Sequence, residues 1–99
     1  MNRDELSLLL YFESCAVDYG GRVNQLRMNA QDFEIAEKWN EDGFIEFGRI
    51  KIADHNRDGG YWVRMTESAW TAAHVERRDR AARMLIQKRY RRTKDKEPA

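Results

Sequence analysis

After Thr66 the sequence contains neither glycine nor proline until Pro98, and this stretch constrains the fold more than any other feature. Thr66 is a favourable N-cap and Glu67 suits a first helical turn, so the pattern predicts one continuous helix near 67–92. The first part of this helix carries a core-facing stripe at helical spacing, formed by Trp70, Ala73 and Arg77.

A helix of this length overhangs the small domain that 99 residues can build. The overhanging part is also apolar in places, through Ala81, Leu85 and Ile86, with Met84 and Tyr90 nearby. An apolar stripe on an overhang is often buried by a second copy of the chain. We therefore expect a homodimer.

The N-terminal segment predicts a second helix, near 4–19, which Gly20-Gly21 ends. One of its faces is formed by Leu6, Leu9, Leu10, Glu13, Ala16 and Val17. Another is formed by Leu8, Tyr11, Phe12, Cys15 and Tyr19. A helix with two apolar faces is nearly surrounded, so it lies at the centre of the domain or meets another subunit.

A third helix is predicted near 30–41, with Asn29 as its N-cap and Gly43 as its end. Its buried stripe is formed by Phe33, Ala36 and Trp39, with Ile35 alongside. Before it, "GRV" at 21–23 could add one edge strand, and "NQLRM" at 24–28 is at most a single turn.

The segment 44–65 predicts a β-hairpin with a polar tip at 53–60. Its first strand, "FIEFGRIKI", changes apolar parity at Gly48, which indicates a bulge or bend there. Its second strand, "YWVRM", alternates regularly, so Tyr61, Val63 and Met65 should face inward. The fold class is therefore α+β and mainly helical.

The net charge of +1 conceals a strong asymmetry along the chain. Residues 1–48 hold four Lys/Arg against ten Asp/Glu, which gives −6, and residues 49–75 hold four against three, which gives +1. Residues 76–99 hold ten against four, which gives +6. Two electrostatically different surfaces are one explanation; the other is a basic end that folds against an acidic body.

The sequence also excludes several classes of protein. No apolar run approaches the ~18 residues that a membrane span needs, and the N-terminus lacks the pattern of a signal peptide. A single cysteine, Cys15, indicates a reducing cytoplasm and a buried packing thiol. No nucleophile–base pair or phosphate loop is present, so we expect neither an enzyme nor a cofactor.

Two metal-like patterns have simpler explanations. "DHNRDG" at 54–59 matches half of a calcium loop, but Met65 stands where the bidentate Glu is needed, so a hairpin turn is the better reading. His55 and His74 have no Cys or His at ligand spacing, which argues against zinc.

The order of these elements resembles the winged helix-turn-helix fold over residues 4 to about 78. Its most specific part is "RMNAQDFEIAEKWNEDGFIEFGRI", which is similar to MarR-type and other small bacterial or phage regulators. The resemblance implies a two-stranded wing and a long C-terminal helix. It divides the chain into a winged-helix core at 1–78, a basic overhang at 79–92 and a flexible tail at 93–99.

The resemblance also implies sites. Asn29 and Gln31 fall at the start of the reading helix, where base edges are contacted, and Gln can pair with adenine. Arg27 before this helix and Arg57 in the wing tip would bind phosphate.

The reading helix is acidic, however, because Glu34, Glu37 and Glu41 must face outward, and duplex DNA carries one negative charge per ~1.7 Å of axis. The last helix is basic instead, through Arg77, Arg78, Arg80, Arg83, Lys88, Arg89, Arg91 and Arg92. The sequence thus predicts a regulator that holds double-stranded DNA through the wing and the basic helix. The alternative is a winged-helix interaction module whose acidic face, Glu34, Glu37 and Glu41, binds a protein partner such as a host factor.

Overall fold

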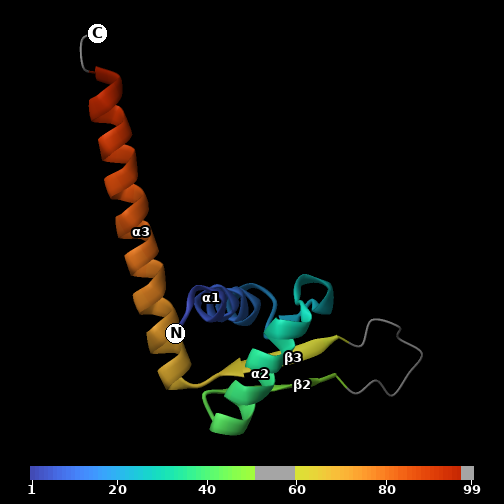
Figure 1. Ribbon diagram of the computed structural model, residues 1–99. Helices are drawn as coiled ribbons and strands as arrows, with labels where there is room; N and C mark the ends of the chain where they lie inside the picture. Colours follow the sequence, from blue (N-terminus) through green and yellow to red (C-terminus); the bar gives the residue numbers. More distant parts are fainter. Residues whose placement is uncertain (51–59, 97–99) are drawn as a thin grey trace.

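A computed structural model describes residues 1–50 and 60–96 of the chain, with side chains described through Gln87. The elements follow in the order α1 (Arg3–Asp18), β1 (Arg22–Val23), the 3₁₀ turn η1 (Gln25–Arg27), α2 (Ala30–Asp42), β2 (Ile45–Arg49), β3 (Tyr61–Met65) and α3 (Glu67–Lys96). The fold is therefore α+β and mainly helical, as predicted (Figure 1).

The sheet has three antiparallel strands in the order β1-β3-β2. The predicted two-stranded hairpin is thus completed by β1, where Val23 pairs with Tyr61. The inward face carries Ile45, Phe47, Val63 and Met65, all buried. The inward alternation predicted for the second strand is confirmed.

The bulge predicted at Gly48 is wrong. Residues Ile45–Arg49 pair one to one with β3, and Gly48 lies opposite Trp62. A Cβ atom at Gly48 would come within 2.8 Å of the Trp62 ring. The glycine is needed because the indole lies across the strand at this point, and the regular ladder is kept.

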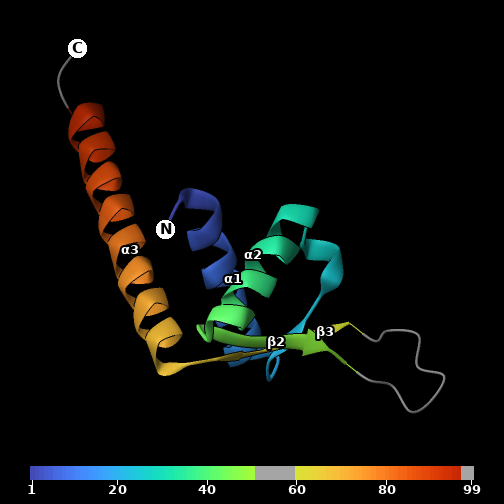
Figure 2. The same cartoon turned by 60° about the horizontal axis from the view of Figure 1, so that its bottom comes forward.

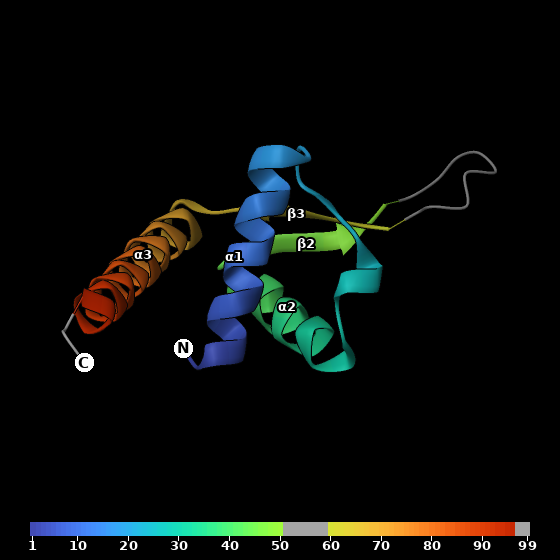
Figure 3. The same ribbon diagram turned by 90° about the horizontal axis from the view of Figure 1, so that it is seen from above.

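Helix α1 lies at the centre of the domain, in contact with α2, α3, β1 and β3 (Figure 3). Leu9 and Phe12 are fully buried in it. The Phe12 ring lies 5.7 Å from that of Phe47 on the sheet and 6.4 Å from that of Trp39 on α2. Most of its two apolar faces is therefore used inside the domain, whereas Val17 and Tyr19 at the C-terminal end of the predicted faces are 67% and 69% exposed.

Helix α2 packs on the same face of the sheet through the predicted stripe. Ala36 and Trp39 are buried, and the half-buried Phe33 lies 6.2 Å from Phe47, ring to ring. Gly43 ends the helix in the left-handed conformation, φ 78°, as its position predicts. The Asn40 side chain then accepts a hydrogen bond from the Phe47 N–H, which anchors β2.

Helix α3 begins where predicted, since the Ala69 N–H donates to the Thr66 hydroxyl. It continues to Lys96, four residues beyond the predicted end. Thirty helical residues span about 45 Å. Only the first half packs on α1, and the second half extends away from the rest of the domain (Figures 1 and 2).

Candidate nucleic-acid interface

The start of α2 is the region expected to contact bases. Asn29 is its N-cap: the Asp32 N–H donates to Asn29 Oδ1 at 2.8 Å, and the Asn29 N–H donates to Asp32 Oδ2 at 3.1 Å. Pairing of Asn with adenine uses both its oxygen and its nitrogen, so base contact by Asn29 would compete with this capping box. Gln31 is exposed on the first turn of α2, and its side chain takes no part in the capping box.

The outer face of α2 is acidic, as predicted. Glu34, Glu37 and Glu41 are all exposed, with the exposed Lys38 between them. The Asp32 carboxylate differs, because it accepts the hydrogen bond from the Asn29 N–H and belongs to the cap. A phosphate backbone laid along this face would meet three carboxylates and one ammonium group.

The two predicted phosphate-binding arginines are placed differently. Arg27 ends η1 and is exposed, three residues before α2 begins. Arg57 lies outside the described residues. Arg27 therefore remains close to the start of α2, where the resemblance puts a phosphate contact.

Arg77 in the first half of α3 has a structural role. Its guanidinium donates to the carboxylate of Glu13, to Ser14 Oγ at 2.8 Å and to the Leu10 carbonyl at 3.4 Å. Glu13 is only 4% exposed, and His74 Nε2 lies 3.4 Å from its second oxygen. This arginine neutralises a buried charge and joins α3 to α1.

Arg80 and Arg83 form a second cluster around the buried Glu76. Arg80 Nε donates to Glu76 Oε1 at 2.8 Å, one helical turn away at i,i+4 spacing, and Arg83 Nη2 donates to the same oxygen at 3.0 Å. The hydrogen bond from Arg80, with a further one from Arg83, holds the pKa of Glu76 below its ordinary value. Arg80 also reaches Ser7 on α1 at 3.3 Å.

The second half of α3 is arranged differently. Residues 81–87 are exposed, and the helix then continues through 88–96, which contain six Lys/Arg and one Asp. The predicted candidates Lys88, Arg89, Arg91 and Arg92 all fall in this segment. The helix carries it away from α2 and the sheet, so its backbone does not fold back on the acidic body (Figure 1).

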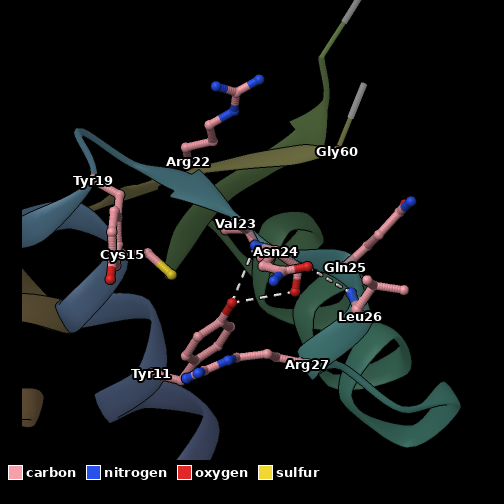
Figure 4. Close-up of a pocket in the computed structure, with 10 residues that line it drawn as sticks. All are labelled: Tyr11, Cys15, Tyr19, Arg22, Val23, Asn24, Gln25, Leu26, Arg27 and Gly60. Atoms are coloured by element: carbon pink, nitrogen blue, oxygen red, sulfur yellow. Dashed lines mark hydrogen bonds between the residues drawn. The ribbon is translucent and has the colours of Figure 1, made fainter. Parts of the chain in front are cut away.

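The sequence did not indicate a groove of about 510 Å³ between α1 and the β1–η1 segment (Figure 4). At its wall the Tyr11 hydroxyl accepts from the Asn24 N–H at 3.1 Å and donates to the Asn24 carbonyl at 3.2 Å. Burial raises the pKa of Tyr11 and also that of the neighbouring Cys15 thiol. A raised pKa disfavours the thiolate, so Cys15 acts as a packing residue.

Metal clusters and membrane-spanning helices are both absent from the described residues. Among residues 1–50 and 60–96, no cluster of His, Cys, Asp and Glu could hold a metal ion. The calcium-like segment at 54–59 lies outside this range. No helix in the described part of the chain combines the length and apolarity that crossing a membrane requires.

The charged residues are thus sorted into three groups: paired arginines at the α1–α3 contact, an acidic α2 face, and a basic end of α3. A comparison with protein-family models, with curated proteins and with solved structures gives no match.

Proposed function

We propose that this chain is a small DNA-binding regulator of the winged helix-turn-helix type. The observation that carries the proposal is the basic end of α3, residues 88–96, which continues as helix beyond the domain and away from its acidic surface. Cations on a projecting helix can approach a phosphate backbone and release its counterions without meeting the carboxylates of α2. The buried cysteine suits a reducing cytoplasm.

The arrangement of elements supports the winged-helix type. Helix α1, the strand β1, the turn η1 and the helix α2 precede a hairpin, β2–β3, whose second strand lies between the other two. Such a fold presents the first turn of α2 and the hairpin to a nucleic acid. Fold alone does not establish function, so the charges of the basic end remain the main support.

The contacts then divide by role. The basic end of α3 binds phosphate and positions the protein, whereas base contacts supply preference between sequences. Gln31 is the best candidate for a base contact, because Asn29 is occupied by the cap. Arg27 adds a phosphate contact beside it. The wing residue Arg57 completes the proposed set.

The test is binding of a labelled duplex at several salt concentrations, measured by fluorescence anisotropy. The R89A/R91A/R92A variant should bind all sequences more weakly, and its log–log salt slope should flatten by about 2.7, at roughly 0.9 per lost phosphate contact. The control R3A/R22A/R78A removes the same charge from exposed positions outside the hairpin, the start of α2 and the basic end, and it should keep the slope. Gln31→Ala should change the preference between sequences instead.

The acidic face of α2 favours a second function, a protein-interaction module. Glu34, Glu37 and Glu41 are exposed together, and they repel DNA. Under this alternative, Glu34→Gln with Glu37→Gln abolishes function in the cell, while changes at the basic end are tolerated. The same pair of changes should leave DNA binding unharmed or improve it. Absence of DNA binding at ~50 mM salt would leave only this second function.

A further inference from the structure

A stripe of exposed apolar side chains follows the side of α3 that faces away from α1. Ala73 and Arg77 contact the domain body, and Val75, two residues from each, therefore lies on the opposite side. Ala82 and Ile86, seven and eleven residues after Val75, fall within about 20° of it around the helix. Val75 is 44% and Ile86 66% exposed, and Leu85, on the flank, is 53% exposed.

We propose that this stripe is the surface on which two copies of the chain associate, with their α3 helices antiparallel and the two-fold axis near residue 81. The central position of α1 supports this choice, since most of its apolar residues, such as Leu9 and Phe12, are already buried inside the domain. The inference does not depend on DNA binding and would hold equally for a protein-interaction module.

The sizes of the side chains fit a crossing at this point. With the axis near residue 81, Val75 of one copy lies level with Ile86 of the other, within about one residue's rise of 1.5 Å. Leu85 flanks the same contact. The small Ala82 lies beside the axis, where two helices approach most closely. Large residues therefore meet at both ends of the contact and small ones meet in the middle.

The charges indicate that a second copy of the chain binds the stripe and that the two α3 helices run antiparallel. Asp79 and Arg83 share one flank of the stripe, and each lies two residues from the axis. The Arg83 guanidinium donates to Glu76 of its own chain through Nη2, and its side chain is 59% exposed toward the flank. An antiparallel second copy brings each Asp79 opposite the other copy's Arg83, which gives two reciprocal ion pairs. A parallel pair would instead put six Lys/Arg of one basic end beside six of the other, and their repulsion disfavours that arrangement.

The first experiment measures mass by light scattering at tens of micromolar chain. The wild type should have a mass of about 24 kDa, twice the 11.8 kDa chain. Ile86→Asp should weaken association by roughly tenfold or more, since it places an unpaired charge in the contact. Leu26→Asp is the matched control, because Leu26 is 88% exposed on η1, outside the stripe, and it should leave the dimer intact. A monomeric wild type would refute the proposal.

The second experiment tests direction by charge exchange. Asp79→Arg leaves two arginines on the flank of every copy, and Arg83→Asp leaves two aspartates, so each variant alone should dissociate. Arg83→Asp also removes one hydrogen bond to Glu76, while the hydrogen bond from Arg80 is kept. Mixed in equal amounts they should form a heterodimer, because both ion pairs are then complementary. Circular dichroism of each variant checks that it is folded. Two folded variants that stay monomeric after mixing would contradict the proposed crossing.

The third experiment uses engineered cysteines, with Cys15 left in place because it is buried. A mixture of Val75→Cys and Ile86→Cys should oxidise to a mixed disulfide. Either variant alone should not, since two Val75 positions would lie about 18 Å apart in the antiparallel pair. A disulfide formed by either variant alone would show parallel helices and overturn the proposal.

Discussion

Two parts of α3, the part that packs on α1 and the basic end at 88–96, both carry cationic side chains, but in different surroundings. Up to Arg83, the three arginines Arg77, Arg80 and Arg83 donate to two buried carboxylates, Glu13 and Glu76. In the second half, residues 88–96 carry six cations on a helix that has left the domain. Charge counted along the sequence therefore overstates the surface available to an anionic partner, because part of it holds the fold together.

The largest effect expected from this difference concerns two adjacent arginines. Arg77→Ala should lower the free energy of unfolding by about 2–3 kcal/mol, because it leaves Glu13 buried without its strongest partner. This expected loss of stability lies at or below the lower end of the range for breaking a buried ion pair, since the Arg77 side chain is half exposed. Arg78→Ala, one residue later on the exposed side, should change stability by less than ~0.5 kcal/mol. Urea unfolding of both variants measures the contrast.

A double variant sharpens the same point. Replacing Glu13 by Leu in the Arg77→Ala background removes the buried charge together with its partner, and should recover much of the lost stability. If Arg77→Ala and Arg78→Ala proved equally mild, the two halves of α3 would not differ in the way described.

A smaller effect should appear as a dependence on pH. The folded pKa of Glu76 is lowered, chiefly by the hydrogen bond from Arg80, so its contribution to stability is complete above its unfolded pKa. That contribution is lost as the pH falls through the lowered value. Glu76→Gln should therefore be less stable than the wild type at neutral pH, and the gap should narrow below about pH 4.3. Urea midpoints measured from pH 7 to pH 3 test this; a gap of constant size would contradict it.

The smallest effect is expected at the projecting end. R89A/R91A/R92A should leave the thermal midpoint almost unchanged, because substitutions away from packed groups change the free energy of unfolding by no more than ~0.5 kcal/mol. The loss of DNA affinity proposed above should thus occur without loss of fold. A large fall in the midpoint would show that this segment supports the domain after all.

Local patterns were sufficient to predict most of the fold. The caps at Asn29 and Thr66, the end of α2 at Gly43 and the inward stripe of Phe33, Ala36 and Trp39 are all confirmed. These features depend on neighbours within one or two helical turns, which sequence spacing determines directly. The i,i+4 pair between Glu76 and Arg80 is equally local in the chain.

Features that depend on distant neighbours were harder to predict. The parity change at Gly48 indicated a bulge, whereas the cause is the Trp62 ring on the adjacent strand. In the sequence, Glu13 is a single carboxylate on an apolar helix face. Its partner Arg77 lies 64 residues further along the chain, so helical spacing does not reveal the pair. The groove beside Tyr11 needs β1 and η1 to fold against α1, and no local pattern shows that.

The length of α3 has a consequence for the kind of DNA site that a dimer could recognise. In the proposed antiparallel pair, the centres of the two 88–96 segments would lie about 33 Å apart along the joined helices. One turn of B-DNA measures about 34 Å, so the two segments would meet equivalent positions of successive turns on one side of the duplex. The operator would then be a palindrome whose half-sites are spaced by about ten base pairs, with the spacing set by a rigid helix.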